Sequence, residues 1–368
     1  MKFSVSRENL LTPLQQVAGV VERRQTLPVL SNVLMVVEGD SLSITGTDLE
    51  VELVARITLE TPAEIDGEIT LPAKKIMDIC KSLPNEAVIM FEQEEQKMRI
   101  KAARSRFTLA TLPANEFPNL EDTASTSEFS INQGYLKQTI DRTSFAMAQQ
   151  DVRFYLNGML LELTQNQIKT VATDGHRLAL CSASIQIEIE GSTQAIVPRK
   201  GILELARLFS DDDTDVNITL SSNHIRAETP SLRFTSKLVD GKFPDYDKVL
   251  PKQGDKLVVG EKAEMKQSFS RVAILSNEKY RGVRVRLENG TLTSVANNPE
   301  QEEAEEVINV NYEGPELEIG FNVSYILDVL GVIKSDTIHM MLADSNSSAL
   351  ITDGEDDSAM YVVMPMRL

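Results

Sequence analysis

The sequence predicts an α+β fold made of three repeats, each with two helices packed on antiparallel sheets. Recurring segments at one spacing predict the repeats. Pro72 lies in LPAKKIMDICKSL and Pro198, 126 positions later, lies in VPRKGILELARLF. A third copy, GFNVSYILDVLGV, places Asn322 another 124 positions along the chain. Each copy has a strand-like entry and then apolar residues at helical spacing.

Two further markers keep the same spacing. Asp48 in TGTDLEVELVARI is followed 126 residues later by Asp174 in VATDGHRLALCS, and Asn298 lies 124 residues beyond it. RFTLATLPANEFPN from Arg106 matches RFTSKLVDGKFPDY from Arg233. Because independent markers share one offset, the sequence predicts a triplication with domains at 1–125, 126–251 and 252–368.

Each repeat is expected to alternate helices with strands. Apolar residues at positions i, i+3, i+4 and i+7 in ENLLTPLQQVAGVV and GYLKQTIDRTSFAMA predict amphipathic helices. Pro13 and Gly19 argue against an uninterrupted first helix. NVLMVVEGDSLSITGTDLEVELVARI alternates as strands do, with a turn at Gly39-Asp40. The expected helical segments are 7–24, 72–83, 134–153, 198–209, 261–281 and 322–334.

The composition predicts a folded protein of the cytoplasm. The chain has 368 residues, of which 42% are hydrophobic, with no Trp. No apolar run approaches the ~18 residues of a membrane span, and the N-terminus lacks a signal-peptide core. Two cysteines, Cys80 and Cys181, are few for a secreted disulfide framework. We therefore expect a reduced compartment and no membrane association.

The charge distribution is uneven. The net charge is -18, which by itself argues against nucleic acid, because phosphate binding needs a basic face. In the six expected helical segments, however, Lys and Arg outnumber Asp and Glu, so the rest of the chain is strongly acidic. Helices gathered on one side would attract a phosphate backbone without reading bases. The ordinary alternative is a set of solvated helix faces.

Opposite charges lie in the first and last repeats. KMRIKAARSRF, from Lys97 to Phe107, is basic, whereas EQEEAEE, from Glu300 to Glu306, holds five glutamates. Opposite signs at opposite ends favour head-to-tail association, which closes into a ring when the rotation permits. Each run could instead be a solvated charge run.

The chain resembles the bacterial DNA sliding clamp family, the β subunit of the replicative polymerase. The resemblance extends over the whole chain and rests on TVATDGHRLALCS, IVPRKGILELARL, SKLVDGKFPDY, AILSNEKYRGVR, NNPEQEEAEE and YVVMPMRL. It implies a head-to-tail homodimeric ring that encircles duplex DNA independently of sequence and tethers the replicative polymerase, making synthesis processive. It also implies an ATP-dependent loader, because no nucleotide-binding motif is found here, and other polymerases and repair proteins as partners.

The resemblance implies three groups of site residues. A groove for partner peptides, apolar and rich in adaptable Met, would be lined by Leu156, Thr173, Gly175, His176, Arg177, Leu178, Pro244, Val249, Asn322, Tyr325, Ser348, Val362, Met364, Pro365 and Met366. DNA contacts would come from Arg24, Lys74, Gln149, Gln150, Phe154, Tyr155, Arg199 and Lys200; Gln149 and Phe154 stand where the family pattern has His and Tyr. For the dimer interface, the resemblance implies head-to-tail pairing, and the opposite charge runs with their apolar neighbours predict the residues: Lys75, Arg104, Arg106, Phe107, Leu109, Ile274, Leu275, Glu302, Glu303, Glu305 and Glu306.

Two other functions compete with this interpretation. An enzyme is not expected, because the three histidines are scattered and the cysteines lack CxxC partners, so the sequence predicts no catalytic residue, metal or cofactor. The acidic run 211–215 is expected to be a solvated loop between a helix and a strand. Asp174 beside His176 suggests catalysis, but its repeat partner TDLEV has no His. A peptide-binding scaffold that does not enclose DNA is the remaining alternative.

Overall fold

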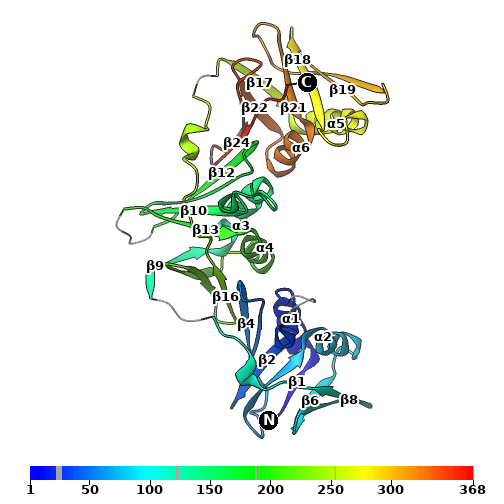
Figure 1. Ribbon diagram of the computed structural model, residues 1–368, viewed down its shortest axis with the longest axis vertical. Helices are drawn as coiled ribbons and strands as arrows, with labels where there is room; N and C mark the ends of the chain where they lie inside the picture. The colour runs from blue at the N-terminus through cyan, green and yellow to red at the C-terminus, as the bar shows by residue number, and fades with distance from the viewer. Residues whose placement is uncertain (22–26, 121–123, 187–188, 190, 253, 368) are drawn as a thin grey trace. The chain divides into compact units, whose positions relative to one another are not determined.

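The computed structural model describes residues 1–367 except 22–26, 121–123, 187–188, 190 and 253. It confirms the α+β fold class, with antiparallel sheets and six described α-helices (Figure 1). The helices are α1 (Arg7–Ala18), α2 (Ala73–Ser82), α3 (Gln133–Thr143), α4 (Arg199–Leu208), α5 (Lys262–Val272) and α6 (Val323–Val332).

The described strands form four antiparallel sheets, in the order given by their pairing. The first is β1 (Lys2–Ser6), β6 (Val88–Glu94), β7 (Lys97–Ala102) and β8 (Ser105–Ala110). The second is β5 (Gly67–Pro72), β2 (Asn32–Glu38), β3 (Ser41–Thr47), β4 (Val51–Thr58), β16 (Leu232–Lys237), β15 (His224–Glu228), β14 (Asp215–Ser221) and β9 (Ser125–Asn132). The third is β13 (Thr193–Pro198), β10 (Gly158–Thr164), β11 (Gln167–Thr173), β12 (Arg177–Ser184), β24 (Ala359–Val363), β23 (Ala349–Asp353), β22 (Thr337–Leu342) and β17 (Lys256–Glu261). The fourth is β20 (Glu303–Asn309), β19 (Thr291–Asn297), β18 (Gly282–Glu288) and β21 (Leu317–Asn322).

The pairing order shows the threefold repeat. Each repeat supplies two groups of four strands, and the two eight-stranded sheets each join a group from one repeat to a group from the next. β4 pairs with β16 in one sheet, and β12 pairs with β24 in the other. The equivalent strands β8 and β20 are sheet edges among the described residues. The remaining pair of equivalent strands, β8 and β20, is therefore not joined within the part of the chain that the structure describes.

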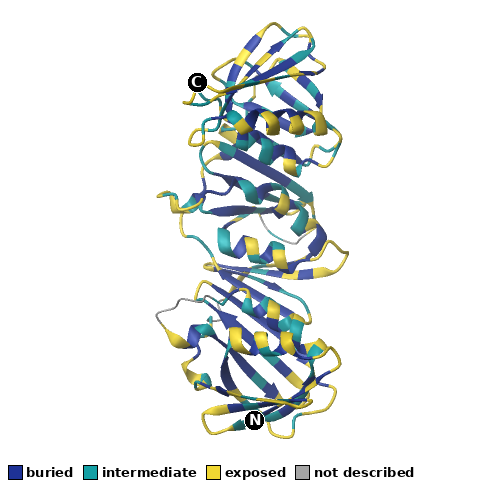
Figure 2. Cartoon of the chain, turned by 90° about the vertical axis from the view of Figure 1, so that its right-hand side faces the viewer, coloured by how far each residue is buried: buried dark blue, intermediate teal, exposed yellow. Residues whose placement is uncertain are grey.

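The helices bury one face and expose the other, as Figure 2 shows. α1 buries Leu10, Leu14 and Val17, and it packs on β3, β4 and α2. α5 buries Met265 and Phe269 and packs on β19, β20 and α6. This spacing of one apolar residue per turn is the predicted amphipathic pattern.

Three helices are shorter than predicted, α1 among them: of the expected segment 7–24, only Arg7–Ala18 is α-helical in the described residues. The segment 134–153 is helical only to Thr143, after which a 3-10 turn leads to Met147 with an extended backbone. The segment 261–281 ends as α-helix at Val272. Beyond the ends of α3 and α5, the apolar residues that continue the helical spacing lie in a 3-10 turn, in which Ala146 and Ala273 are buried but Ile274 is 76% exposed. α1 runs through Pro13 and ends at Ala18.

The predicted turn at Gly39-Asp40 is confirmed. These two residues connect β2 to β3, and Gly39 has a φ of 57°. A positive φ is readily adopted by glycine, which suits a two-residue hairpin.

The contacts divide the chain into two compact units. One unit holds Met1–Gly134 with Leu203–Leu238, and the other holds Tyr135–Ile202 with Val239–Leu368. The division follows the sheets, because each eight-stranded sheet joins strands of two successive repeats. The groove residues predicted above all belong to the second unit.

In the ranges that the structure describes, helices are too short or too polar to pass through a lipid bilayer.

Candidate partner groove, DNA contacts and sheet edges

The junction of β12 with β24 brings together residues far apart in the sequence. Arg177 pairs with Val363, and Leu178 pairs with Val362. Just beyond the strand end, the amide of Met364 donates to the carbonyl oxygen of His176 over 3.0 Å. The chain then leaves the sheet, and the amide of Met366 donates to the carbonyl oxygen of Gly320 over 2.8 Å. The C-terminal segment is thus fixed against both β12 and β21.

An apolar cluster lies beneath this junction. Leu178, Val362, Phe243 and Tyr246 are buried in it, and Val249 packs against it while partly exposed. Leu178 and Val362 are only 2% and 1% exposed, so the predicted groove residues on the strands belong to the core. Met364, at 37% exposed, is accessible. β24 is therefore buried at its C-terminal end, up to its last residue, and the segment that follows it, beginning with Met364, is accessible at the surface of the junction.

Arg177 is the most connected side chain of the junction. Its guanidinium donates to the carboxylates of Asp174, over 3.2 Å, and Asp328, and to the carbonyl oxygen of Phe145 over 2.8 Å. Its Cζ lies 4.5 Å from the centre of the Tyr325 ring and 5.2 Å from that of Phe145. Such stacking suits a planar, delocalised cation. Arg177 therefore links β12 to α6.

Sequence reasoning missed Asp328 and Phe145. Neither residue lies in a motif that indicates the groove. Asp328 is the acidic residue of α6, one turn after Tyr325, so its i, i+3 spacing was the available signal.

A second ion pair lies at the opposite end of β12. Arg142 of α3 donates to Asp356 over 2.6 Å and to the Ser358 hydroxyl over 2.6 Å. The amide of Ser182 donates to the carbonyl oxygen of Ser358 over 2.8 Å. Burial opposes ionisation of Asp356, but hydrogen bonds from Ser358 and Arg142 outweigh it and lower the pKa of that carboxyl to about 2. Arg142 therefore links α3 to the segment that leads into β24, at the end of the β12–β24 junction opposite Arg177.

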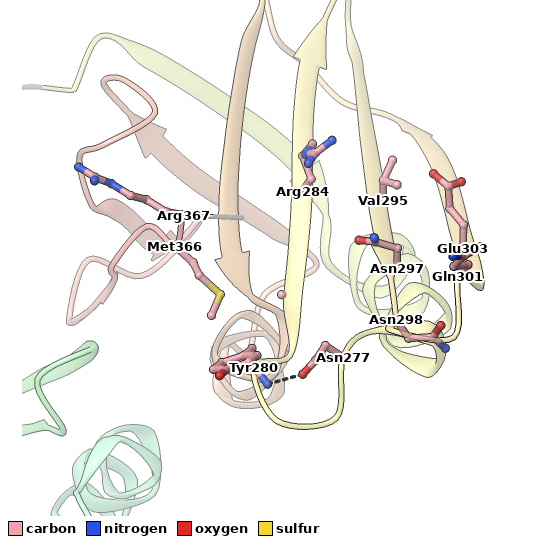
Figure 3. A pocket seen from close by; sticks show the side chains of 11 residues that line it. Asn277, Tyr280, Arg284, Val295, Asn297, Asn298, Gln301, Glu303, Met366 and Arg367 are labelled. Carbon is pink, nitrogen blue, oxygen red and sulfur yellow. Dashed lines mark hydrogen bonds between the residues drawn. The ribbon is translucent and has the colours of Figure 1, made fainter.

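Some of the predicted groove residues border three separate hollows. His176 and Arg177 line a hollow of 450 Å³. Val249 and Ser348 line another of 560 Å³, and Met366 lines a third of 670 Å³ (Figure 3). The His176 and Tyr325 rings lie nearly parallel, with 6.5 Å between their centres. The remaining predicted lining residues belong to the chain segments around the same junction: Leu156, Thr173, Gly175, Pro244, Asn322 and Pro365.

The first junction, between β4 and β16, has the same backbone pattern but different side chains. The amide of Lys237 donates to the carbonyl oxygen of Glu50, as that of Met364 does to His176. Glu52 pairs with Thr235, where the second junction has Leu178 and Val362. Glu52 is 4% exposed, and its carboxylate accepts from the amide of Leu120 over 3.2 Å. At this pair of positions the first junction therefore has polar side chains where the second has apolar ones.

The residues predicted to contact DNA are mostly accessible. Gln149, Gln150 and Arg199 line the same 450 Å³ hollow. Phe154 is 58% exposed, and its ring lies edge to face with that of Tyr155, 6.0 Å between centres. Lys74 is exposed on α2, whereas Lys200 is half-buried on α4. Arg24 lies outside the described residues.

Most of the predicted interface residues lie on or next to two edge strands, β8 and β20. Arg106, Phe107 and Leu109 belong to β8, with Arg104 in the turn before it and Lys75 exposed on α2. Glu303, Glu305 and Glu306 belong to β20, with Glu302 just before it. Ile274 is 76% exposed after α5, next to the half-buried Leu275.

Two glutamates already have partners within the chain. Glu306 accepts from the Arg271 guanidinium over 2.6 Å and 2.8 Å, and Glu302 accepts from the Asn298 amide over 2.6 Å. Glu303 and Glu305 are left exposed on the edge strand. Sequence reasoning missed Val307, 56% exposed on β20, because the charge run ends at Glu306.

The acidic motifs that suggested chemistry have local structural roles. Asp174 accepts from the backbone amides of His176 and Arg177 over 2.9 Å and 3.0 Å, which is a turn and not a proton relay. The run 211–215 follows α4 and leads into β14, as predicted, and Asp212 accepts from Gln133 and from the Thr214 amide. No cluster able to hold a metal ion was found among the described residues.

Comparison with known proteins identifies the class of this fold. The family models of the DNA polymerase III beta subunit match three consecutive stretches: the N-terminal domain over residues 1–121, the central domain over 130–245 and the C-terminal domain over 247–367. The beta sliding clamps of Pseudomonas aeruginosa and Escherichia coli K12 are 64% and 53% identical over 368 residues, covering all of both chains.

Solved structures agree over the full length. The crystal structure of the DNA polymerase sliding clamp from Pseudomonas aeruginosa with ligand matches with a TM-score of 0.98 at 64% identity. That of the DnaN sliding clamp from Bartonella birtlesii bound to griselimycin matches with a TM-score of 0.96 at 37% identity. Each match covers 100% of both chains.

The fold and these likenesses define a DNA sliding clamp. The chain belongs to the DNA polymerase III beta subunit family. Its function in DNA replication follows from full-length likeness to sliding clamps, and the alternative of a scaffold that does not enclose DNA is not favoured.

Proposed function

We propose that two copies of this chain join head to tail, β8 of each pairing with β20 of the other, into a ring around duplex DNA. One observation supports this most directly. The strands equivalent to β8 and β20 pair at both junctions within the chain, as β16 with β4 and β24 with β12. An exposed edge strand is a template for pairing with another chain. A head-to-tail contact closes into a ring when its rotation permits.

The repeats also predict the register of the missing junction. In each repeat, a hairpin leads into the strand that forms or would form a junction, namely β4, β12 or β20. Across these hairpins, Thr47 pairs with Glu52, Thr173 with Leu178, and Asn297 with Glu303. Glu52, Leu178 and Glu303 are therefore equivalent. Two positions further along these strands, Val54 of β4 is equivalent to Glu305 of β20.

The other side of the junction follows from RFTLA and RFTSK, in which Arg106 is equivalent to Arg233. Arg233 pairs with Val54. By equivalence, Arg106 of one copy lies opposite Glu305 of the other, and Thr108 lies opposite Glu303. Opposite charges facing each other across strands stabilise the pairing and fix its orientation.

Cysteine cross-linking tests this junction. Cβ atoms directly opposite in antiparallel strands lie about 4.5–5.5 Å apart, close enough for a disulfide after a small adjustment. Thr108→Cys with Glu303→Cys should give covalent dimers under mild oxidation, whereas Ala110→Cys with Glu306→Cys, five positions out of register, should not. The native Cys80 and Cys181 are buried. Equal cross-linking by both pairs, or by neither, would contradict the register.

DNA is held, in this proposal, by enclosure and weak phosphate contacts. Lys74 and Arg199 are supported by their positions in the first turns of α2 and α4, with Lys200 beside Arg199. Gln149 and Gln150 are supported by their exposure beside Arg199. Such contacts carry no sequence information, which suits sliding. Phe154 offers a stacking surface without a hydroxyl.

Partner proteins bind, in this proposal, at the β12–β24 junction. The apolar cluster containing Leu178 and Val362, with Met364 and Val249 at its surface, supports a site for Leu and Phe side chains of a short peptide. A relative bound to griselimycin shows that a clamp of this fold takes a ligand. The replicative polymerase, other polymerases and repair proteins would share this site, and so would the ATP-dependent loader.

We assign no catalytic role to the chain. The three domains, 1–125, 126–251 and 252–368, serve enclosure and tethering in the cytoplasm. Tethering raises the effective concentration of a polymerase at the primer end without new contacts to DNA.

A further inference from the structure

The connecting segment, residues 239–250, carries Pro244 and Val249 into the proposed partner site and is bonded to its sheet through a tyrosine. Tyr246 is 6% exposed, and its ring packs in the apolar cluster beneath the β12–β24 junction. Its hydroxyl donates to the carboxylate of Glu162 on β10. The other oxygen of that carboxylate accepts from the Gln194 side chain of β13 over 2.9 Å. The tyrosine hydroxyl therefore ties the connecting segment to two strands.

This hydrogen bond is the directional contact of a short turn with the sheet. The turn is the 3-10 turn Tyr246–Lys248, and the amides of Val249 and Leu250 donate to the carbonyl oxygen of Tyr246 over 2.9 Å and 3.3 Å. In the described residues, the other hydrogen bonds of 244–250 stay within that segment. Burial alone is non-directional, whereas a hydroxyl at the tip of the ring that donates to a carboxylate fixes the orientation of the ring. The bond therefore sets where the backbone of Val249 lies.

The first repeat shows that the fold does not require this bond. At the repeat spacing of 126 positions, Glu162 is equivalent to Val36 and Tyr246 is equivalent to Leu120. Val36 packs against the apolar cluster of its own repeat. Neither valine nor leucine has a polar side-chain atom, so the connecting segment of the first repeat is held without such a bond. The tyrosine–glutamate pair belongs to the repeat that builds the partner site.

We infer that Tyr246 and Glu162 are positioning residues of the partner site, and that their hydrogen bond holds the connecting segment so that Pro244 and Val249 line the groove. Neither residue has to touch the bound peptide. Without the bond, the segment occupies the binding-competent position for a smaller fraction of the time, and the apparent affinity falls by that fraction. The inference rests on the proposed partner site.

Fluorescence anisotropy of a short labelled peptide with a Leu-Phe pair tests the inference on the full-length protein. We expect Tyr246→Phe and Glu162→Leu each to weaken binding about fivefold, on the order of one hydrogen bond. The double variant should bind no more weakly than either single variant, because both changes remove the same bond. Glu162→Gln, whose carboxamide can still accept from the hydroxyl, should keep most of the affinity.

Thr170→Val separates positioning from a loss of stability. Thr170 is buried on the face of β11 that α3 covers, where its hydroxyl donates to the carbonyl oxygen of Thr139 over 3.1 Å. This control should lower the urea midpoint as Tyr246→Phe does, but leave peptide binding unchanged. Hydrogen–deuterium exchange at the amides of Val249 and Leu250 should become faster in Tyr246→Phe and not in Thr170→Val.

Two outcomes would overturn the positioning role and leave the partner site in place: parent-like affinity of Tyr246→Phe and Glu162→Leu, or an equal loss of affinity in Thr170→Val. If Tyr246→Phe does not fold, the comparison of Glu162→Leu with Glu162→Gln decides the question, because equal affinities of these two variants exclude a role for the bond. Failure of the unaltered protein to bind the peptide would instead overturn the proposed partner site.

Discussion

Arg177 of β12 is bonded to Asp328 of α6, a residue 151 positions further along the chain, and stacks on Tyr325 one turn before that aspartate. The Arg177 side chain is 12% exposed and that of Asp328 is 44% exposed. One buried guanidinium thus connects the strand that begins the second junction to the last helix of the chain.

Replacing Arg177 should destabilise this junction. We expect Arg177→Ala to lower the free energy of unfolding by about 2 kcal/mol, less than the ~3–5 kcal/mol of a fully buried pair, because water screens Asp328. Arg177→Lys should recover only part of the loss, since an ammonium lacks the planar fork and the stacking. Urea unfolding measures the effect, and a double-mutant cycle with Asp328→Ala isolates the pair.

The control is Lys248→Ala. Lys248 pairs with Asp245, but their side chains are 80% and 52% exposed, so the change should have little effect on the free energy of unfolding. An effect of Arg177→Ala no larger than this would show that the Arg177 contacts do not hold the junction.

Stability should depend on pH through Asp356. Its pKa is lowered from 3.8 to about 2 by Ser358 and Arg142 against the effect of burial. The stabilisation is therefore present above about pH 4 and is lost as the pH falls toward 2. Above about pH 4, the free energy of unfolding of the Asp356→Asn variant should lie below that of the parent protein. The difference between the two should shrink as the pH falls toward 2, because the parent then loses the stabilisation that the variant already lacks. Urea midpoints between pH 6 and pH 2 measure this, with the exposed Glu316→Gln as control; a constant difference would refute the assignment.

Charge reversal should break the dimer and a second reversal should restore it. Arg106→Glu and Glu305→Arg should each weaken association, and the double variant should recover it, because the repeat register places these residues opposite each other. Changing Glu302, Glu303, Glu305 and Glu306 together to Lys should weaken the dimer most. Light scattering gives the mass. Glu316→Arg is the control, and a dimer mass that no variant alters would exclude β20 as the interface.

Removing Met364–Leu368 should abolish polymerase and loader binding while the dimer persists. The deletion removes two backbone hydrogen bonds, at His176 and Gly320, but leaves Val362 and Val363 in β24. Surface plasmon resonance measures partner binding, and light scattering checks the mass. Normal binding by the truncated protein would refute the partner site.

Neutralising Lys74, Arg199 and Lys200 should weaken the binding of DNA without affecting dimerisation. Removing one phosphate contact should reduce the slope of log affinity against log salt by about 0.9. DNA-dependent stimulation of the polymerase should fall in parallel. Unchanged stimulation would show that these side chains do not serve DNA binding.

The fold was predictable because a triplication repeats each signal three times. Pro72 and Pro198 both precede a helix at the predicted place, and the Gly39 turn depends only on local geometry. Helix ends were predicted less well, since apolar residues around Phe145 and Ile274 continue the helical spacing after the backbone has turned.

The site was predictable only in part. The motif residues His176, Arg177 and Met364 meet across the β12–β24 junction. Asp328 could not be chosen without knowing that α6 packs beside Arg177. Likewise, the charge run does not show that Glu306 is bound to Arg271, because partners within a fold depend on which face of the strand each residue occupies.

Enclosure of DNA is tested most directly on nicked circular DNA. The protein is placed on the circle by a clamp loader with ATP, washed in high salt and followed before and after the circle is cut. Binding through phosphate contacts alone disappears in high salt on either topology. We predict that the protein stays on intact circles and leaves once they are linear. Equal loss from circular and linear DNA would contradict the ring.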